Sequence, residues 1–194
     1  MAIQQPMSKA AQLTPDQTKA LQIHNEGNFP FPILSPNLPP LFLLTFPRPQ
    51  PLTLLPARKQ ATQQHGTARP ALIWDAHLTS EAEKWAKHLA QLNQGLKHST
   101  GDQRPGQGEN LFWYSSGGDL AGASQGWVNE QKSYHGEKIG EGNFEAYGHY
   151  TQVIWPSTTR VGLASAKSSN GGNFIVGRYS PPGNFSGESA WSGK

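Results

Sequence analysis

A proline-rich segment, residues 27–56, divides this chain because no helix can run through it. The segment holds nine of the sixteen prolines and a single charged residue. Proline lacks an amide hydrogen and clashes with the turn before it, so proline at this density ends a helix. Both flanks nevertheless carry helical sequence, residues 15–26 before it and 57–66 after it, with Gly66 as a C-terminal cap. Joined directly, the flanks are predicted to form one helix that the segment interrupts.

Two explanations of this segment are open. The first is a retained, in-frame intron: codons for Gly27-Asn28 can contain a donor-like GT, and codons for Pro56-Ala57 an acceptor-like AG. Splicing would then place Ala57 directly after Glu26. The second is a real proline-rich loop that serves as a polyproline II ligand or as an anchor at a membrane interface.

The remaining sequence is long enough for one domain and no more. Without the segment about 160 residues remain, which is enough to bury a single hydrophobic core. We expect a disordered N-terminus over residues 1–14, one domain over residues 15–184 with the interruption at 27–56, and a C-terminal tail over residues 185–194.

Charge and cysteine content narrow the class of protein. The formal net charge is +3, and the lysines and arginines are scattered rather than clustered, which argues against a nucleic-acid partner. Weak attraction to an anionic membrane surface stays open. The chain has no cysteine, so we expect a domain without disulfides in a reducing compartment.

The N-terminal sequence carries no recognisable targeting signal. It lacks the apolar stretch of a signal peptide, and position 2 is alanine rather than the glycine that N-myristoylation requires. No segment reaches the roughly 18 consecutive apolar residues of a membrane span. We expect a protein of the cytoplasm or of the periphery of endomembranes, and an extracellular protein if the natural N-terminus differs from this one.

Apolar spacing predicts the main helices. Residues 80–92 repeat apolar side chains at helical spacing, and Ser80 with Glu83 forms a capping box. The side chains expected to face the core are Ala82, Trp85, Leu89 and Leu92. A second helix is predicted after Asp119, which is a suitable N-cap.

Two strands follow towards the C-terminus. Residues 160–167 and 173–179 are strand-like, and the turn formers of 168–172 join them into a hairpin. Strands bracketed by helices predict an α+β fold, a three-layer α-β-α sandwich with a central antiparallel sheet.

Two histidines and two glutamates stand out because each interrupts an apolar setting. His149 lies in the aromatic run 148–155, and His98 follows the predicted helix, where a loop can aim its ring into a cleft. Glu109 begins a predicted strand, and Glu130 lies on the inward face of the helix after Asp119. A buried carboxylate is costly unless it is paired, hydrogen-bonded or metal-bound.

These four residues suggest one shared polar site. Neutral imidazoles and carboxylates are suitable ligands for zinc and similar divalent cations. The alternative is a structural hydrogen-bond network that ties loops to the scaffold.

Three motifs carry a family resemblance. Residues 148–155 (GHYTQVIW), 108–111 (GENL) and 179–184 (YSPPGN) resemble, in order, motifs of the CAP superfamily, the cysteine-rich secretory, antigen 5 and pathogenesis-related class 1 proteins. The resemblance runs from about residue 21 to residue 184 and is greatest to the cysteine-poor, Golgi-associated branch of the pathogenesis-related proteins. It implies the same layered fold. It also implies that a tetrad lines a central cleft able to hold a divalent metal: His98, Glu109, Glu130 and His149.

The resemblance favours a binding protein over an enzyme. It implies a sterol or other lipid as ligand, and a homodimer stays open. Aromatic and apolar residues of the glycine-rich loop before His149 are candidates for lipid contact: Tyr134, Ile139, Phe144 and Tyr147. Alternatively, these side chains hold the loop to the core.

Two further functions remain as alternatives. In a metal-dependent hydrolase, His98 or His149 would orient a metal-bound water, and Glu109 or Glu130 would act as general base. No HExxH helix, GxSxG elbow or cysteine nucleophile is present, and no catalytic residue is assigned. A protein-interaction module in defence or virulence rests on the family resemblance alone.

Overall fold

The computed structural model describes residues 12–26 and 57–194, and its centre is a four-stranded sheet of order β1-β3-β4-β2. The strands are β1 (Ile73–Trp74), β2 (Gly108–Tyr114), β3 (Arg160–Lys167) and β4 (Asn173–Ser180). The α-helices are α1 (Pro15–Glu26), α2 (Ala57–His65), α3 (Ala76–Leu92), α4 (Leu120–Asn129) and α5 (Gly148–Ile154).

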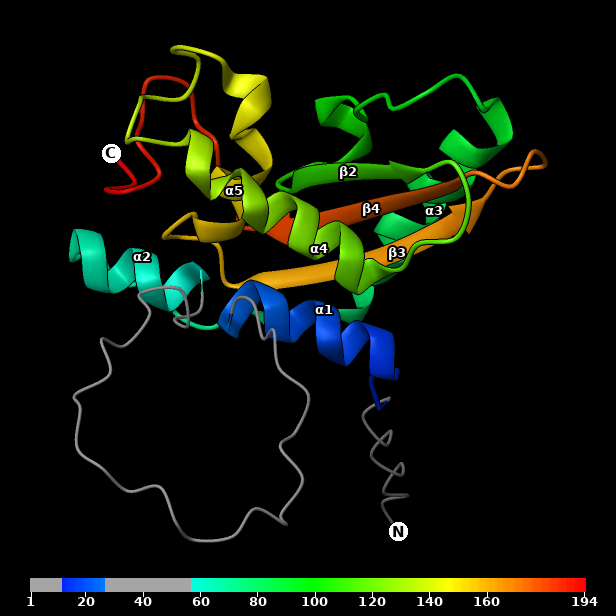
Figure 1. Ribbon diagram of the computed structural model, residues 1–194, viewed down its shortest axis with the longest axis horizontal. Helices are drawn as coiled ribbons and strands as arrows, with labels where there is room; N and C mark the ends of the chain where they lie inside the picture. The colour runs from blue at the N-terminus through cyan, green and yellow to red at the C-terminus, as the bar shows by residue number, and fades with distance from the viewer. Residues whose placement is uncertain (1–11, 27–56) are drawn as a thin grey trace, which may run out of the picture.

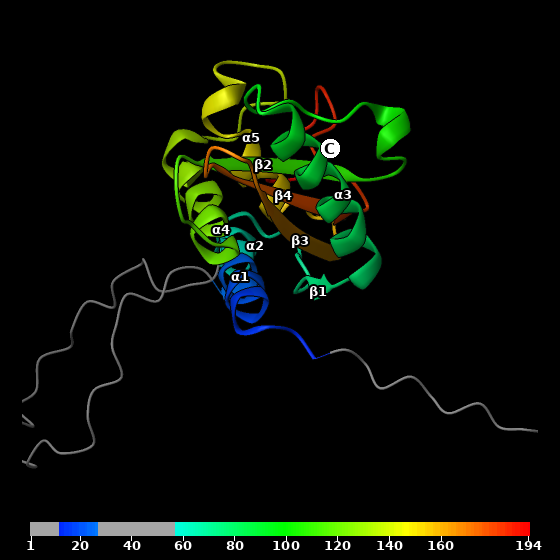
Figure 2. The same cartoon turned by 90° about the vertical axis from the view of Figure 1, so that its right-hand side faces the viewer.

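Helices cover both faces of the sheet. Figure 2 shows α3 on one side, and α1, α2 and α4 on the other. Figure 1 shows α5 beside α4 on that second side, above the end of the sheet where β2 begins. The predicted three-layer α-β-α sandwich is confirmed.

The sheet is antiparallel except at one edge. The β3–β4 hairpin pairs Arg160 with Ser180, and β2 runs antiparallel to β4 with Gly108 opposite Tyr179. The predicted antiparallel pairing holds for β2, β3 and β4, and the short edge strand β1 adds a parallel pairing with β3 that was not predicted. A two-residue strand is too short to show the alternation by which strands are identified in a sequence.

The start of α3 also differs from the prediction. The helix begins at Ala76, because the Asp75 side chain accepts a hydrogen bond from the amide of Leu78 and caps it. The predicted capping box at Ser80 was therefore wrong. Leu92, predicted to face the core, is 45% exposed because α3 ends there, with the next residue in the left-handed conformation.

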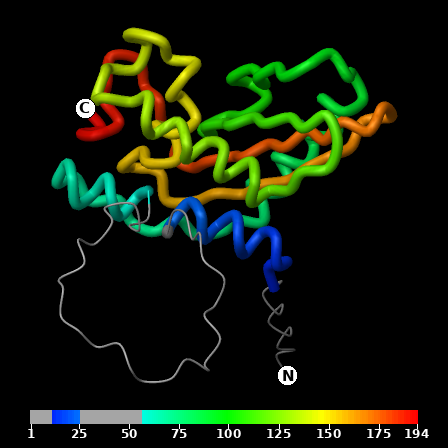
Figure 3. The backbone as a smooth tube through the Cα atoms, viewed as in Figure 1, coloured from blue at the N-terminus to red at the C-terminus, as the bar shows by residue number. Residues whose placement is uncertain are grey.

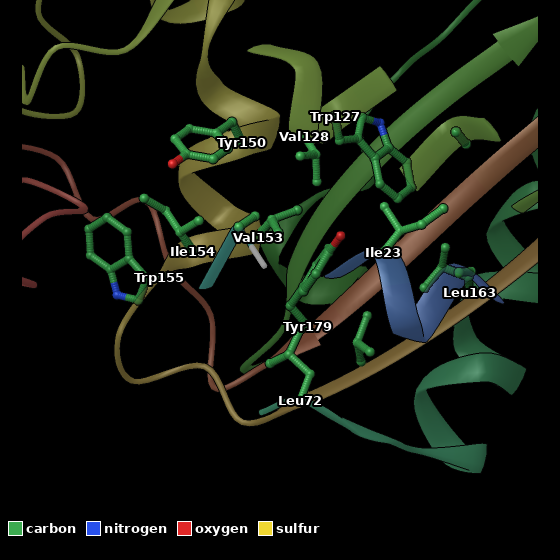
Figure 4. Packing of buried hydrophobic residues seen from close by; sticks show 14 of the residues in the cluster. Ile23, Leu72, Trp127, Val128, Tyr150, Val153, Ile154, Trp155, Leu163 and Tyr179 are labelled. Atoms are coloured by element: carbon green, nitrogen blue, oxygen red, sulfur yellow. The ribbon is translucent and has the colours of Figure 1, made fainter. Parts of the chain in front are cut away.

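Two hydrophobic cores flank the sheet. The smaller packs α3 against the sheet through Trp85, Leu89, Leu111 and other apolar side chains. The larger lies on the opposite face, where Figure 4 shows Ile23 of α1 and Trp127 of α4 gathered near Tyr179 of β4. Burial of these two apolar layers is the main stabilising term of the fold.

The last ten residues, 185–194, lie against the domain rather than apart from it. Figure 3 shows this segment beside the loop that precedes α5. Ala190 is fully buried, Trp191 stacks on His65 with ring centroids 3.9 Å apart, and Arg69 donates to the carbonyl of Ala190 at 2.7 Å. The segment predicted as a tail is thus part of the packed structure.

Residues 1–11 and the insertion 27–56 lie outside the described residues, so the predictions for them stay predictions. Within the described ranges, no helix combines the length and apolar character needed to cross a membrane.

Candidate functional site

A cleft of about 560 Å³ opens where the start of β2, the N-terminal half of α5 and the loop after β4 meet. Its lining is rich in polar side chains: His98, Arg104, Gly108, Glu109, Asn110, Phe144, Glu145, Gly148, His149, Gln152, Gly183 and Asn184. Three of the four predicted site residues line this cleft, namely His98, Glu109 and His149, and the fourth, Glu130, contacts His149.

The first histidine–carboxylate pair joins the two ends of the loop between α3 and β2. His98 Nδ1 lies 2.7 Å from Glu109 Oε1, which also accepts the amide of Ser99 at 3.0 Å. The other oxygen accepts the Ser99 hydroxyl at 2.8 Å and pairs with Arg178 at 3.0 Å. Both carboxylate oxygens therefore have two partners each.

These partners keep Glu109 ionised. Its side chain is fully buried, and burial by itself would raise the pKa. The hydrogen bond from His98, the charge of Arg178 and the hydrogen bonds from Ser99 outweigh that effect and hold the pKa of Glu109 below its usual value. Glu109 is an enclosed anion that orients His98, whose own side chain is 55% exposed.

The second pair is built on a helix end. His149 Nδ1 lies 2.7 Å from Glu130 Oε1. Glu130 Oε2 accepts the backbone amides of His149 and Tyr150 at 3.0 and 3.2 Å. These amides belong to the first turn of α5, where the helix dipole favours a negative charge. Glu130 therefore caps α5 and orients the ring of His149.

Two buried arginines hold the opposite end of α5. Arg58 donates to the carbonyls of Val153 at 2.7 Å and Trp155 at 3.1 Å, and Arg69 donates to the carbonyl of Ile154 at 2.7 Å. Burial, and to a smaller extent the charge of Arg69, lower the pKa of Arg58 to about 9. Charges of opposite sign at its two ends stabilise this short helix, which carries His149.

A buried polar chain connects α1 with the cleft. His24 Nδ1 is 2.9 Å from the carbonyl of Ala20, so the proton is on Nδ1 and Nε2 accepts from the Tyr179 hydroxyl at 2.8 Å. Asn110 then donates to Tyr179 at 3.1 Å and to the carbonyl of His149 at 3.0 Å. The chain braces the backbone of His149 from α1.

The geometry leaves the same atom of each imidazole for a ligand. Because a carboxylate accepts the Nδ1 proton of each neutral ring, Nε2 carries the free lone pair. A carboxylate behind a metal-binding histidine is a common arrangement in proteins. Across residues 12–26 and 57–194, no group of three or more His, Cys, Asp or Glu side chains is placed to hold a metal ion. The protein part of a cation site here would therefore be the two imidazoles.

The loop residues predicted to contact lipid fall into two classes. Tyr134, Ile139 and Tyr147 are buried in the larger core, and the Tyr134 hydroxyl lies 2.9 Å from Ser189 Oγ. Phe144 is 36% exposed and lines the cleft. Its ring packs over Gly148, where any side chain would collide with it. The described structure thus brings one of the four, Phe144, to the cleft.

Sequence reasoning missed several cleft residues. Gln152 accepts the amide of Gly183 at 2.9 Å and fixes the loop after β4, and Asn184 donates to the carbonyl of Gly148 at 2.8 Å. Asn184 ends the predicted motif 179–184, which was the one signal for this loop. Arg178, the partner of Glu109, lies on β4, and no local pattern identifies such a distant pair.

Comparisons with known proteins agree with this architecture. A pathogenesis-related protein PR-1 of Medicago truncatula is 41% identical over 119 residues, which cover 60% of this chain and 66% of that protein. A pathogenesis-related protein 1 of Arabidopsis thaliana is 35% identical and covers 74% of this chain and 91% of its own length. The human Golgi-associated plant pathogenesis-related protein 1 is 34% identical over 68% of this chain and 82% of its own.

Among solved structures, the crystal structure of NaASP2 with Zn²⁺ superposes with a TM-score of 0.64 at 22% identity, over 95% of this chain and 89% of that one. At that identity the likeness establishes the fold. The family model of the cysteine-rich secretory proteins, CAP, matches residues 58–179. Ten of the twelve residues that line the cleft, from His98 to Gln152, lie in this matched region, and the chain belongs to the CAP family of cysteine-rich secretory and pathogenesis-related proteins.

Proposed function

We propose that this protein is a CAP-domain binding protein whose cleft holds a divalent cation through Nε2 of His98 and Nε2 of His149. The single observation that carries the proposal is that both rings line one cleft, each with Nδ1 2.7 Å from a glutamate oxygen. Such a carboxylate fixes the ring and raises the basicity of the opposite nitrogen.

In this proposal the glutamates orient the ligands rather than bind the metal directly. The oxygens of Glu109 are fully used by His98, Ser99 and Arg178. The oxygens of Glu130 are used by His149 and the start of α5. The remaining coordination positions fall to water or to a bound molecule, as in open zinc sites.

Zinc is the cation that the ligand chemistry favours. Imidazole suits zinc and copper, whereas magnesium and calcium prefer oxygen ligands. The solved structure of the fold relative NaASP2 was determined with Zn²⁺, which gives the same cation as a starting point for tests.

Calorimetric titration with zinc tests the proposal. We expect one site in the wild type and loss of that site in the double variant His98→Ala/His149→Ala. The matched control is His77→Ala/His135→Ala, which removes two exposed histidines outside the cleft. Equal zinc affinity in the wild type and the cleft variant would reject the proposal.

Lipid binding is a second candidate, supported by Phe144. This ring presents apolar surface in a cleft lined by many polar side chains, and it meets the ring of Tyr147 edge-on, with ring centroids 5.6 Å apart. Sterol or anionic lipid would contact Phe144, and Phe144→Ala should weaken sedimentation with lipid vesicles. Trp113→Ala removes another exposed aromatic residue that does not line the cleft and serves as the control. If both variants sediment like the wild type, Phe144 has no such role.

A further inference from the structure

Arg104 is a cation in the cleft that the metal-binding proposal does not use. It lies in the loop between His98 and Glu109, and it is the one lysine or arginine among the residues that line the cleft. The loop is folded around its side chain. Arg104 Nε donates to the carbonyl of Ser99 at 3.1 Å, and one Nη donates to the carbonyl of Gln107 at 3.0 Å. A half-buried guanidinium is thereby held in place before any ligand binds.

Most of the N–H donors of this guanidinium have no hydrogen-bond partner among the described residues. An arginine side chain has five N–H groups, and two of those of Arg104 bond the loop carbonyls, so three remain. Among the described residues, no carboxylate lies within ion-pair distance of Arg104, whereas Arg178 is paired with Glu109. The charge of Arg104 is therefore available to a ligand.

A second polar atom at the cleft also lacks a partner. Asn184 lines the cleft, and its Oδ1 is buried without a hydrogen-bond partner within the described ranges, while its Nδ2 bonds Gly148. A buried acceptor without a donor is costly, so the position of Asn184 is held by its other hydrogen bond and by the loop around it. Arg104 and Asn184 thus line the same hollow as the two imidazoles, and the guanidinium of Arg104 keeps free donors.

The charge balance of the cleft changes sign when a cation binds. The carboxylates of Glu109 and Glu130 each contact a histidine, and Arg178 neutralises Glu109. Glu145 is the remaining lining carboxylate, and it is exposed to water, where its charge is screened. A divalent cation added beside Arg104 makes the cleft net positive and therefore attractive to an anion.

We propose that the cleft takes a ligand with an oxyanion, such as a phosphate group, which Arg104 binds beside the cation held by His98 and His149. The inference rests on the proposed metal-binding function for its second contact. The planar fork of arginine matches phosphate oxygens, and charge-assisted hydrogen bonds of this kind are about twice as strong as neutral ones. The oxyanion comes either from a small free phosphate or from a lipid headgroup.

The test measures phosphate and zinc separately. Inorganic phosphate is titrated into the protein, first without metal and then with one equivalent of zinc, and zinc is titrated alone. In parallel, sedimentation is measured with phosphatidylcholine vesicles that contain phosphatidic acid. The variant is Arg104→Gln, and the matched control is Arg160→Gln, an exposed arginine that does not line the cleft.

We expect Arg104→Gln to weaken binding of the phosphate group about tenfold or more, which corresponds to about 1.4 kcal/mol. We expect zinc to strengthen phosphate binding in the wild type. Zinc affinity should be unchanged in Arg104→Gln, which also verifies that the loop with His98 and Glu109 is folded. If Arg104→Gln also loses zinc affinity, its loop is disturbed, and Arg104→Lys is measured in its place. Arg104→Lys keeps the charge and should retain part of the phosphate affinity.

The outcomes separate the two proposals. If only free phosphate binding depends on Arg104, the ligand is a small molecule, and if only vesicle binding does, the ligand is a headgroup. Equal binding by wild type, Arg104→Gln and Arg160→Gln in both arms overturns the anion site even if zinc binds. Absence of zinc binding in the wild type overturns the metal site instead.

Discussion

The two histidine–glutamate pairs of the cleft have the same geometry but different supports. In each pair, Nδ1 lies 2.7 Å from a glutamate oxygen. The side chain of Glu109 is fully buried and paired with a guanidinium from β4, whereas that of Glu130 is 21% exposed and held by amides at the start of α5. One imidazole is thus fixed by an ion pair across the sheet, and the other by a helix end.

The difference predicts how each pair fails. When one partner of a buried ion pair is removed, the other is left as an uncompensated charge. A partly exposed carboxylate that loses a partner forms hydrogen bonds with water instead. The first pair should therefore be coupled to the stability of the whole domain. The second should be coupled mainly to the position of α5 and to ligand affinity.

Arg178→Met should have the largest effect. The change leaves Glu109 buried without its cation, and we expect the free energy of unfolding to fall by about 3–5 kcal/mol. Urea unfolding followed by circular dichroism measures this loss. The control Arg160→Met breaks an exposed ion pair with Asp75 and should cost less than about 1 kcal/mol.

A second substitution checks the cause. If the loss comes from the unpaired charge, Arg178→Met/Glu109→Gln should recover part of the stability lost in Arg178→Met alone. A double variant that is less stable than Arg178→Met would contradict the ionic support assigned to the first pair.

The second pair should respond to acid through His24. Its ring is fully buried in the chain that braces His149, and burial lowers its pKa from 6.5 to about 4. Because the unfolded chain takes up the proton first, stability is complete above pH 6.5 and falls as the pH drops. By pH 4 we expect a loss of about 3 kcal/mol. Unfolding measured between pH 7 and pH 4 gives this slope.

Two variants isolate the contribution of His24. His24→Gln should flatten the slope between pH 6.5 and pH 4.5, whereas His77→Ala, an exposed histidine on α3, should leave it unchanged. Glu109 also loses stabilisation in acid because its pKa is lowered, but that loss begins below its unfolded value of 4.5. An unaltered slope in His24→Gln would show that another group titrates.

The contrast between the pairs also explains what the sequence could predict. The layered fold, the β3–β4 hairpin and the cap at Asp119 follow from local patterns that the structure confirms. His98 and His149 were recognisable because a polar ring in an apolar or loop setting needs a partner. A shared polar site with Glu109 and Glu130 was expected from the residue types and from the family resemblance. Which glutamate pairs with which histidine had no sequence signal, because the segments meet only in the folded chain.

Other features had no sequence signal. In the sequence, Arg58 and Arg69 look like surface charges of a polar helix and a loop. In the structure both are buried, and both donate hydrogen bonds to backbone carbonyls of α5. Tyr134 and Tyr147 read equally well as ligand contacts or as core, and burial decides for the core in the structure. In each case, long-range packing rather than local spacing sets the environment.

Glu130→Gln should have a smaller effect on stability than Arg178→Met and a clear effect on zinc. Loss of an oriented carboxylate behind a metal-binding histidine typically costs about 10–100-fold in affinity. Loss of the charge at the N-terminus of α5 should cost about 1 kcal/mol of stability. Zinc titration and urea unfolding of one sample measure both, and unchanged zinc affinity would remove Glu130 from the site.

Deletion of residues 27–56 should have the smallest effect on either pair. Figure 1 shows α1 and α2 following one another along the same side of the sheet. Their most buried residues are Ala20, Ile23 and His24 in α1, and Ala57, Arg58 and Ala61 in α2. After the deletion, the last three would occupy positions 27, 28 and 31, so the buried positions would run 20, 23, 24, 27, 28, 31.

That series is the spacing of one face of a single helix, so the deletion brings the two buried faces into register. A variant in which one alanine replaces residues 27–56 shifts α2 by one residue, about 100° around the axis, and should turn Arg58 and Ala61 away from the core. We expect the 27–56 deletion to unfold at or above the urea concentration of the full chain and to keep zinc affinity within about twofold. The out-of-register variant should be less stable. An equal loss of stability in both variants would mean that α1 and α2 are separate helices. The bracing of His149 from α1 would then depend on the inserted residues.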